Sequence, residues 1–151
     1  MISVQIDGTP PPDISSARLK RTAEEVLLYT GSPPDASLTI LLTGDEKLQR
    51  LNLQYRGIDE TTDVLSFPAD YTDPDSGGLY LGDVLVSTPR AAAQAAAGGH
   101  ALGDEIQLLV VHGVLHLLGY DHADAEGEAS MWSAQNEILR RLGCHVSPPA
   151  A

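Results

Sequence analysis

The segment DEIQLLVVHGVLHLLGYDH, residues 104–122, predicts the element around which this fold is built. Before Gly119, apolar side chains fall on nearly every side of the segment and leave little polar surface for water. A helix that is apolar almost all round is buried in the centre of a domain. We therefore expect a central helix over about 104–118, capped near Gly103–Asp104 and ended by Gly119.

Three histidines in this segment have the spacing of a metal site. His112 and His116 are four residues apart, which places both imidazoles on one face of a helix. Gly119 then breaks the helix, and the turn after it can bring His122 back towards the pair. Three imidazole nitrogens suit zinc and leave its fourth position open, as in catalytic sites. We predict one zinc ion per chain, although three imidazoles also bind other divalent transition metals.

The spacing of the three histidines has two other interpretations. Unrelated polar residues in a buried helix would explain one histidine, but three buried imidazoles without partners would be costly. The spacing His-x-x-x-His-x-x-Gly-x-x-His is also that of metzincin proteases, which place a glutamate, their general base, directly after the first histidine. Here that residue is Gly113, which cannot accept a proton. This argues against peptide hydrolysis by that mechanism.

The bulk composition limits the class of protein. A chain of 151 residues fits one domain, and no apolar run is long enough to cross a bilayer. No secretory signal is visible and Cys144 is the only cysteine, so we expect a cytoplasmic protein without internal disulfides. The formal net charge is −12, and residues 57–139 carry one arginine against fourteen acids. This is not the basic footprint of a general nucleic-acid-binding module.

Apolar periodicity and turn residues divide the rest of the chain into strands and helices. Pro68 is expected to stop the third strand, and the acidic stretch 69–78 to form a loop. We expect a single α+β domain over 1–146, with a small mixed sheet packed on the buried central helix, and a flexible tail over 147–151. The expected strands are 2–6, 37–43, 63–68 and 79–87, and the other expected helices are about 15–30, 45–54, 88–97 and 126–142.

Three blocks of the chain resemble one family. HGVLHLLGYDH, residues 112–122, is similar to the signature of the YbeY family of bacterial metal-dependent endoribonucleases. YRGIDETTDVLSFP at 55–68 and LGDVLVS at 81–87 resemble the other two characteristic blocks of that family, in the same order. The resemblance covers most of residues 38–142, and the last helix fits it through Met131, Gln135, Glu137 and Leu139.

The resemblance implies a zincin-like α+β fold with zinc on His112, His116 and His122. It also implies a single-strand-specific endoribonuclease that acts in rRNA maturation, notably at the 16S rRNA 3′ end, and in ribosome quality control. Its expected partners are single-stranded RNA and the ribosome or ribosomal proteins, with no membrane and no DNA. The important arginine of the family corresponds to Arg56.

The chemistry of Arg56 suits this activity. A guanidinium is a planar, permanently charged fork that matches phosphate oxygens. With few other cations nearby in sequence, Arg56 and zinc are expected to supply much of the local positive field. The alternative is a surface arginine paired with Asp59 or Asp63.

The general base is not evident from the sequence, and Asp121 and Asp63 are the candidates. Asp121 can instead orient a histidine by hydrogen bonding to its N–H, or cap the turn. Turn or helix-cap roles are the simpler expectation for Asp63 and for Asp83. The remaining histidines, His100 and His145, are expected to be exposed to solvent.

Two other functions stay open. One is a zinc metallopeptidase-like hydrolase, favoured by the histidine spacing and disfavoured by Gly113. The other is a ribosome-associated factor in which zinc is structural. An acidic surface suits binding to basic ribosomal proteins, because complementary charge steers association, but it can equally serve only solubility.

Overall fold

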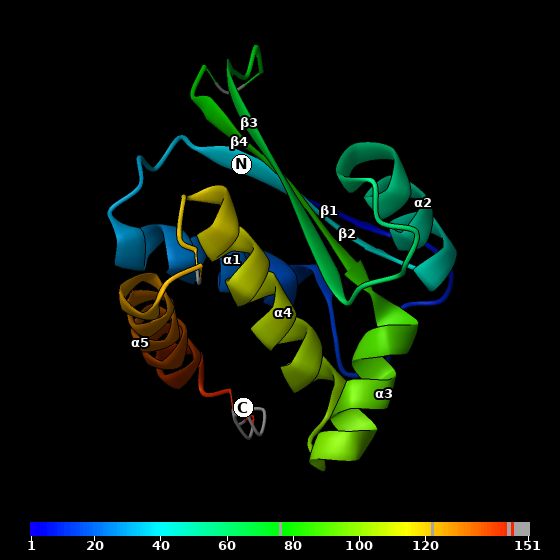
Figure 1. Cartoon of the computed structure of the whole chain (residues 1–151). Helices are drawn as coiled ribbons and strands as arrows, with labels where there is room; N and C mark the ends of the chain where they lie inside the picture. Colours follow the sequence, from blue (N-terminus) through cyan, green and yellow to red (C-terminus); the bar gives the residue numbers. More distant parts are fainter. Residues whose placement is uncertain (76, 122, 145, 147–151) are drawn as a thin grey trace.

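The central helix is α4, Leu102–Leu117, which lies against one face of the sheet and contacts α1, α3 and α5 (Figure 1). The computed structural model describes residues 1–75, 77–121, 123–144 and 146, so the expected tail at 147–151 lies outside the described residues. The helix begins before the expected cap. Its N-cap residue is Ala101, which has no capping side chain, and instead the Gly103 N–H donates to the Asp13 carboxylate at 2.7 Å. A contact from a distant segment therefore decides where α4 starts.

The sheet has four strands in the order β1-β2-β4-β3. The pairs β1–β2 and β2–β4 are parallel, whereas β3 pairs antiparallel with β4 and forms an edge. This confirms the expected mixed sheet of an α+β domain. The strands are β1 Ile2–Ile6, β2 Ser37–Thr43, β3 Val64–Thr72 and β4 Leu79–Ser87.

The other helices begin and end at local signals in the sequence. Ser15, Ser87 and Asp124 cap three of them by accepting a hydrogen bond from a backbone N–H in the first turn. Each of the four ends at a glycine in the left-handed conformation, which a side chain would disfavour. The four helices are α1 Ser16–Thr30, α2 Asp45–Arg56, α3 Thr88–Gly98 and α5 Ala125–Leu142.

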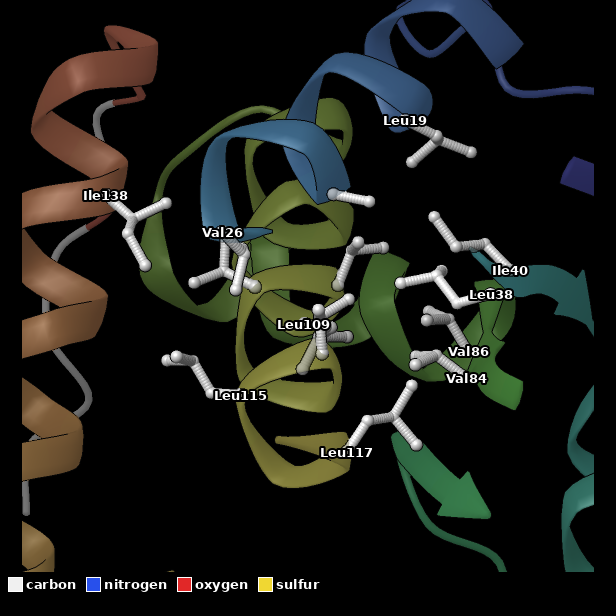
Figure 2. Close-up of a cluster of buried hydrophobic side chains, with 14 of the residues drawn as sticks. Leu19, Val26, Leu38, Ile40, Val84, Val86, Leu109, Leu115, Leu117 and Ile138 are labelled. Atoms are coloured by element: carbon white, nitrogen blue, oxygen red, sulfur yellow. The ribbon is translucent and has the colours of Figure 1, made fainter. Parts of the chain in front are cut away.

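The two faces of the sheet carry separate apolar clusters. Because side chains alternate along a strand, β2 sends Leu38 and Ile40 to one face and Leu41 to the other. The first face packs on α1 and α4, α5 packs on those two helices, and the main core lies between these layers (Figure 2). The second face packs on α2 through a small cluster of Leu41, Leu48, Leu65 and Leu85. Helices α2 and α4 thus lie on opposite faces of the sheet.

Strand β3 is longer than expected. It continues through Pro68 to Thr72, so part of the predicted 69–78 loop is strand. Pro68 pairs with Gly82, and the register shifts between Pro68 and Tyr71. A proline has no N–H to give to a ladder, but an edge strand tolerates it where the pairing is irregular.

Helix α4 lies very close to the sheet at Gly113. A Cβ atom there would be 2.5 Å from Val84 Cγ1 and 3.2 Å from Val64 Cγ2. The Ser66 hydroxyl donates to the Gly113 carbonyl at 2.8 Å and joins β3 to the helix between the two histidines. The position that holds the glutamate in metzincins therefore has no room here for any side chain. In the part of the chain that is described, no helix is long and apolar enough to span a membrane.

We predict that Gly113→Ala lowers the free energy of unfolding by about 1–3 kcal/mol, because the added methyl overpacks the contact with Val84. Helix propensity alone predicts the opposite sign, a gain of about 1 kcal/mol. Urea denaturation of the single variants and of Gly113→Ala/Val84→Ala decides between them. Val84→Ala should cost less in the Gly113→Ala background than in the wild type, and a stabilised Gly113→Ala protein would contradict the packing argument.

Candidate metal centre

His112 and His116 point their ring nitrogens at each other from one face of α4. Their Nε2 atoms are 3.1 Å apart, and the ring centroids are 4.7 Å apart at an interplanar angle of 67°. Two nitrogen ligands on a tetrahedral zinc, each about 2.0–2.1 Å from the metal, lie about 3.3 Å apart. The pair therefore fits two neighbouring positions of one zinc ion.

Gln135 of α5 holds the ring of His112. Its Oε1 lies 3.2 Å from Nδ1 of His112, and the glutamine side chain is buried. An amide oxygen only accepts hydrogen bonds, so Nδ1 carries the proton in this contact. This leaves the lone pair of Nε2 for a metal, which is the usual role of a hydrogen-bond partner behind a ligating histidine.

The third predicted ligand, His122, lies outside the described residues. Among the residues that are described, no group of three or more His, Cys, Asp or Glu side chains is arranged to hold a metal ion. His112 and His116 supply two nitrogen donors, with Gln135 behind His112 only, and the three-histidine zinc centre stays a prediction. Burial raises the pKa of the Cys144 thiol to about 12, and its Sγ donates to the Asp104 carbonyl in the first turn of α4.

A cavity of about 600 Å³ opens beside His112. Asp63, one of the two candidate bases, lines it together with Gln94, and the Gln94 amide donates to the Asp63 carboxylate at 3.2 Å. Of the turn or helix-cap role expected for Asp63, the structure shows a bend directly before β3, whereas the cap of α3 is Ser87. Asp121 follows the turn after α4 and is exposed, and its role stays a prediction.

Two further expectations about acidic and histidine residues are wrong. The side chain of His100 is only 10% exposed, because the chain turns back after α3 and brings its Nε2 to within 3.1 Å of Glu105 Oε2 on α4. Both side chains line the cavity at His112. Asp83 caps no helix: it lies within β4 and accepts a hydrogen bond from Tyr80, whose pKa rises to about 12 through burial and this contact. His145 lies outside the described residues.

Arg56 is not among the residues that line the cavity at His112. It is exposed in the last turn of α2, on the face of the sheet opposite α4. Its guanidinium makes no ion pair within the described parts of the chain, and Asp59 accepts from Gln49 instead. The alternative of a surface pairing with Asp59 or Asp63 is therefore not present among the described residues, and a role in catalysis stays a prediction.

The sequence did not predict which residues of α3 and α5 line this cavity. Gln135 entered only through the resemblance to the YbeY family, and no motif pointed to Trp132 or Gln94. Trp132 and Gln135 are three residues apart on α5, so they share one face of that helix. The spacing was visible in the sequence, but nothing in it indicated that this face meets His112.

Comparison with known proteins agrees with the fold and the motif. Residues 8–143 match the family model described as Endoribonuclease YbeY. Relatives named Endoribonuclease YbeY include one from Dehalococcoides mccartyi, 40% identical over 85% of this chain and 88% of its own length. Another from Roseiflexus sp. is 44% identical over 93% of both chains, and one from Mycobacterium tuberculosis is 37% identical over 91% and 82%. The chain therefore belongs to the YbeY family.

A solved structure supports the same conclusion on the fold. The solution structure of a Thermotoga maritima protein superposes with a TM-score of 0.58 at 25% sequence identity. The match covers 100% of this chain and 99% of that protein. The whole described arrangement of helices and sheet is thus shared with a known fold.

We predict that Gln135→Leu weakens zinc binding about 10- to 100-fold, because His112 loses the partner that sets its tautomer and orientation. Zinc affinity is measured by competition with a chromophoric chelator at pH 7. The matched control is Gln107→Leu, since Gln107 is as buried as Gln135 but bonds Thr22 rather than a histidine. Gln107→Leu should lower stability without changing zinc affinity, and equal loss of affinity in both variants would refute the specific role of Gln135.

Proposed function

We propose that this protein is a zinc-dependent endoribonuclease that cleaves single-stranded RNA in rRNA maturation, at the 16S rRNA 3′ end, and in ribosome quality control. One observation carries the proposal: two histidines converge their Nε2 atoms beside a cavity, in a chain whose relatives are named endoribonucleases. We further propose that the protein acts in the cytoplasm, on ribosomal particles.

His112, His116 and, from the family motif, His122 would hold the zinc ion. Bound there, zinc would act as a Lewis acid towards a phosphodiester. The side chains of the protein orient the metal ligands and exchange protons. Gln135 keeps Nδ1 of His112 protonated, and the Asp63 carboxylate is the candidate acceptor for a proton inside the cavity.

Arg56 would bind the RNA backbone. Its guanidinium is exposed and makes no ion pair with another described residue, so it can make a bidentate contact with a phosphate. Helices α2 and α4 lie on opposite faces of the sheet, with the β3 edge beside them. We therefore place the contact of Arg56 on the part of the RNA strand that lies outside the cavity. Arg56 then contributes to binding of the RNA more than to the bond-breaking step.

The packing at Gly113 disfavours the peptidase alternative. A metzincin-type glutamate at that position would collide with Val84, so this helix cannot present the base that such enzymes use. The alternative of a ribosome-associated factor with structural zinc makes a different prediction, namely that chelation unfolds the protein and that no RNA is cut.

We predict about one zinc per purified chain, and loss of zinc and of RNA cleavage in His116→Ala. Arg56→Ala should keep its zinc and raise KM for single-stranded RNA about 10- to 100-fold, the expected loss of a hydrogen bond to a charged group. Arg50→Ala, an exposed arginine on the same helix, is the matched control and should change KM less. Metal analysis and cleavage of labelled RNA measure these effects, with casein as the peptidase substrate; cleavage of casein but not RNA would overturn the proposal.

In cells that lack the protein, we predict 16S rRNA with unprocessed 3′ ends. Expression of the wild type should restore mature ends, whereas the His116→Ala variant should not. End mapping by primer ligation and sequencing measures this. Normal 3′ ends in cells without the protein would exclude the proposed role in maturation.

A further inference from the structure

The only tryptophan of the chain lies beside His112, one of the two candidate metal ligands on α4. Trp132 projects from α5, and its side chain is part of two hollows, the cavity of about 600 Å³ and a smaller one of about 160 Å³. His112 and Gln135 line both hollows as well. Trp132 is 37% exposed, so a large aromatic surface faces solvent within the site rather than the core.

The edge of this ring is held in place. The indole N–H donates to Glu128 Oε1 at 3.3 Å, one turn earlier on α5. This contact ties the polar edge of the ring to its own helix. A tryptophan whose indole edge is fixed in this way, next to the two candidate metal ligands, is suited to stack with a flat ligand.

The charge of the cavity selects which part of a nucleotide fits. Its lining contains the carboxylates of Asp63 and Glu105, and no lysine or arginine is among its described lining residues. A phosphate would be repelled there, whereas a neutral base would not. Much of the remaining lining is apolar, and the volume is within the usual range for small-molecule pockets.

We propose that this cavity is a nucleobase subsite, in which the base next to the cleaved phosphodiester stacks on Trp132. The proposal rests on the proposed endoribonuclease function and adds a specificity-determining residue to it. The phosphate would then lie towards His112 and His116, outside the acidic part of the cavity, and Asp63 would contact the base instead of accepting a proton in the cleavage step.

The acidic lining also predicts a preference among bases. The Asp63 carboxylate accepts from Gln94 and from Thr62, and a carboxylate has about four lone-pair positions. The positions left over accept hydrogen bonds but cannot donate them. Adenine, cytosine and guanine carry an exocyclic amino group that can donate to this oxygen. The donor of uracil, N3–H, lies between two carbonyl oxygens, which a carboxylate repels. The subsite should therefore prefer amino-bearing bases over uracil.

Fluorescence of the zinc-loaded protein tests the subsite directly, because all tryptophan emission comes from Trp132. Titration with AMP should quench the emission, and UMP should quench it only at higher concentration. In cleavage assays with single-stranded RNA, Trp132→Ala should raise KM about ten- to hundredfold, whereas Trp132→Phe should recover most of the loss. Zinc content and thermal melting show whether each variant is folded and loaded.

Tyr71→Ala is the matched control, because Tyr71 is also an exposed aromatic residue, 56% accessible, but stacks on Tyr80 in the sheet. Its KM should stay at the wild-type value. If the wild type cleaves RNA but AMP leaves the emission unchanged and Trp132→Ala keeps its KM, the subsite is wrong and the proposed function stands. If AMP quenches the emission but no RNA is cleaved, the nucleobase site stands and the proposed function fails.

Discussion

The close approach of α4 to the sheet at Gly113 is the contact on which the rest of the structure depends. It sets the depth of the helix in the core, and the Ser66 hydroxyl joins β3 to the helix at the same residue. His112 and His116 flank this contact in sequence, so their position relative to the sheet follows from it. The same contact leaves no space for a side chain at position 113. One packing constraint thus places the candidate ligands and excludes the base of a metzincin.

The acidic and the basic side chains of the candidate site lie in two different parts of the molecule. The cavity beside His112 contains carboxylates, and cations such as Arg56 lie on α2 across the sheet. An acidic protein can act on a polyanion if its bases, phosphates and backbone are bound in different places. In our proposal the base enters the acidic cavity, and the two histidines face the cleaved phosphodiester. Helix α2 binds the RNA strand at a point further along its backbone.

Local patterns predicted most elements, and long-range contacts account for the differences. The α+β class and the central helix followed from periodicity and turn chemistry. The start of α4 did not, because Asp13 supplies the cap from ninety residues away. The burial of His100 did not either, because its partner Glu105 meets it only after the chain turns between α3 and α4. Pro68 marked an irregular position in an edge strand rather than the end of a strand.

The sequence by itself determined the chemistry: two histidines at helical spacing, a glycine where a protease needs a glutamate, and the blocks of the YbeY family. Local spacing is enough for these, because they lie within one helix or one motif. Only the tertiary structure decided which residues surround the pair. Gln135 and Trp132 reach His112 from α5 because that helix packs beside α4, whereas Arg56 lies on the other face of the sheet. Contacts between separate elements depend on packing, which no local pattern encodes.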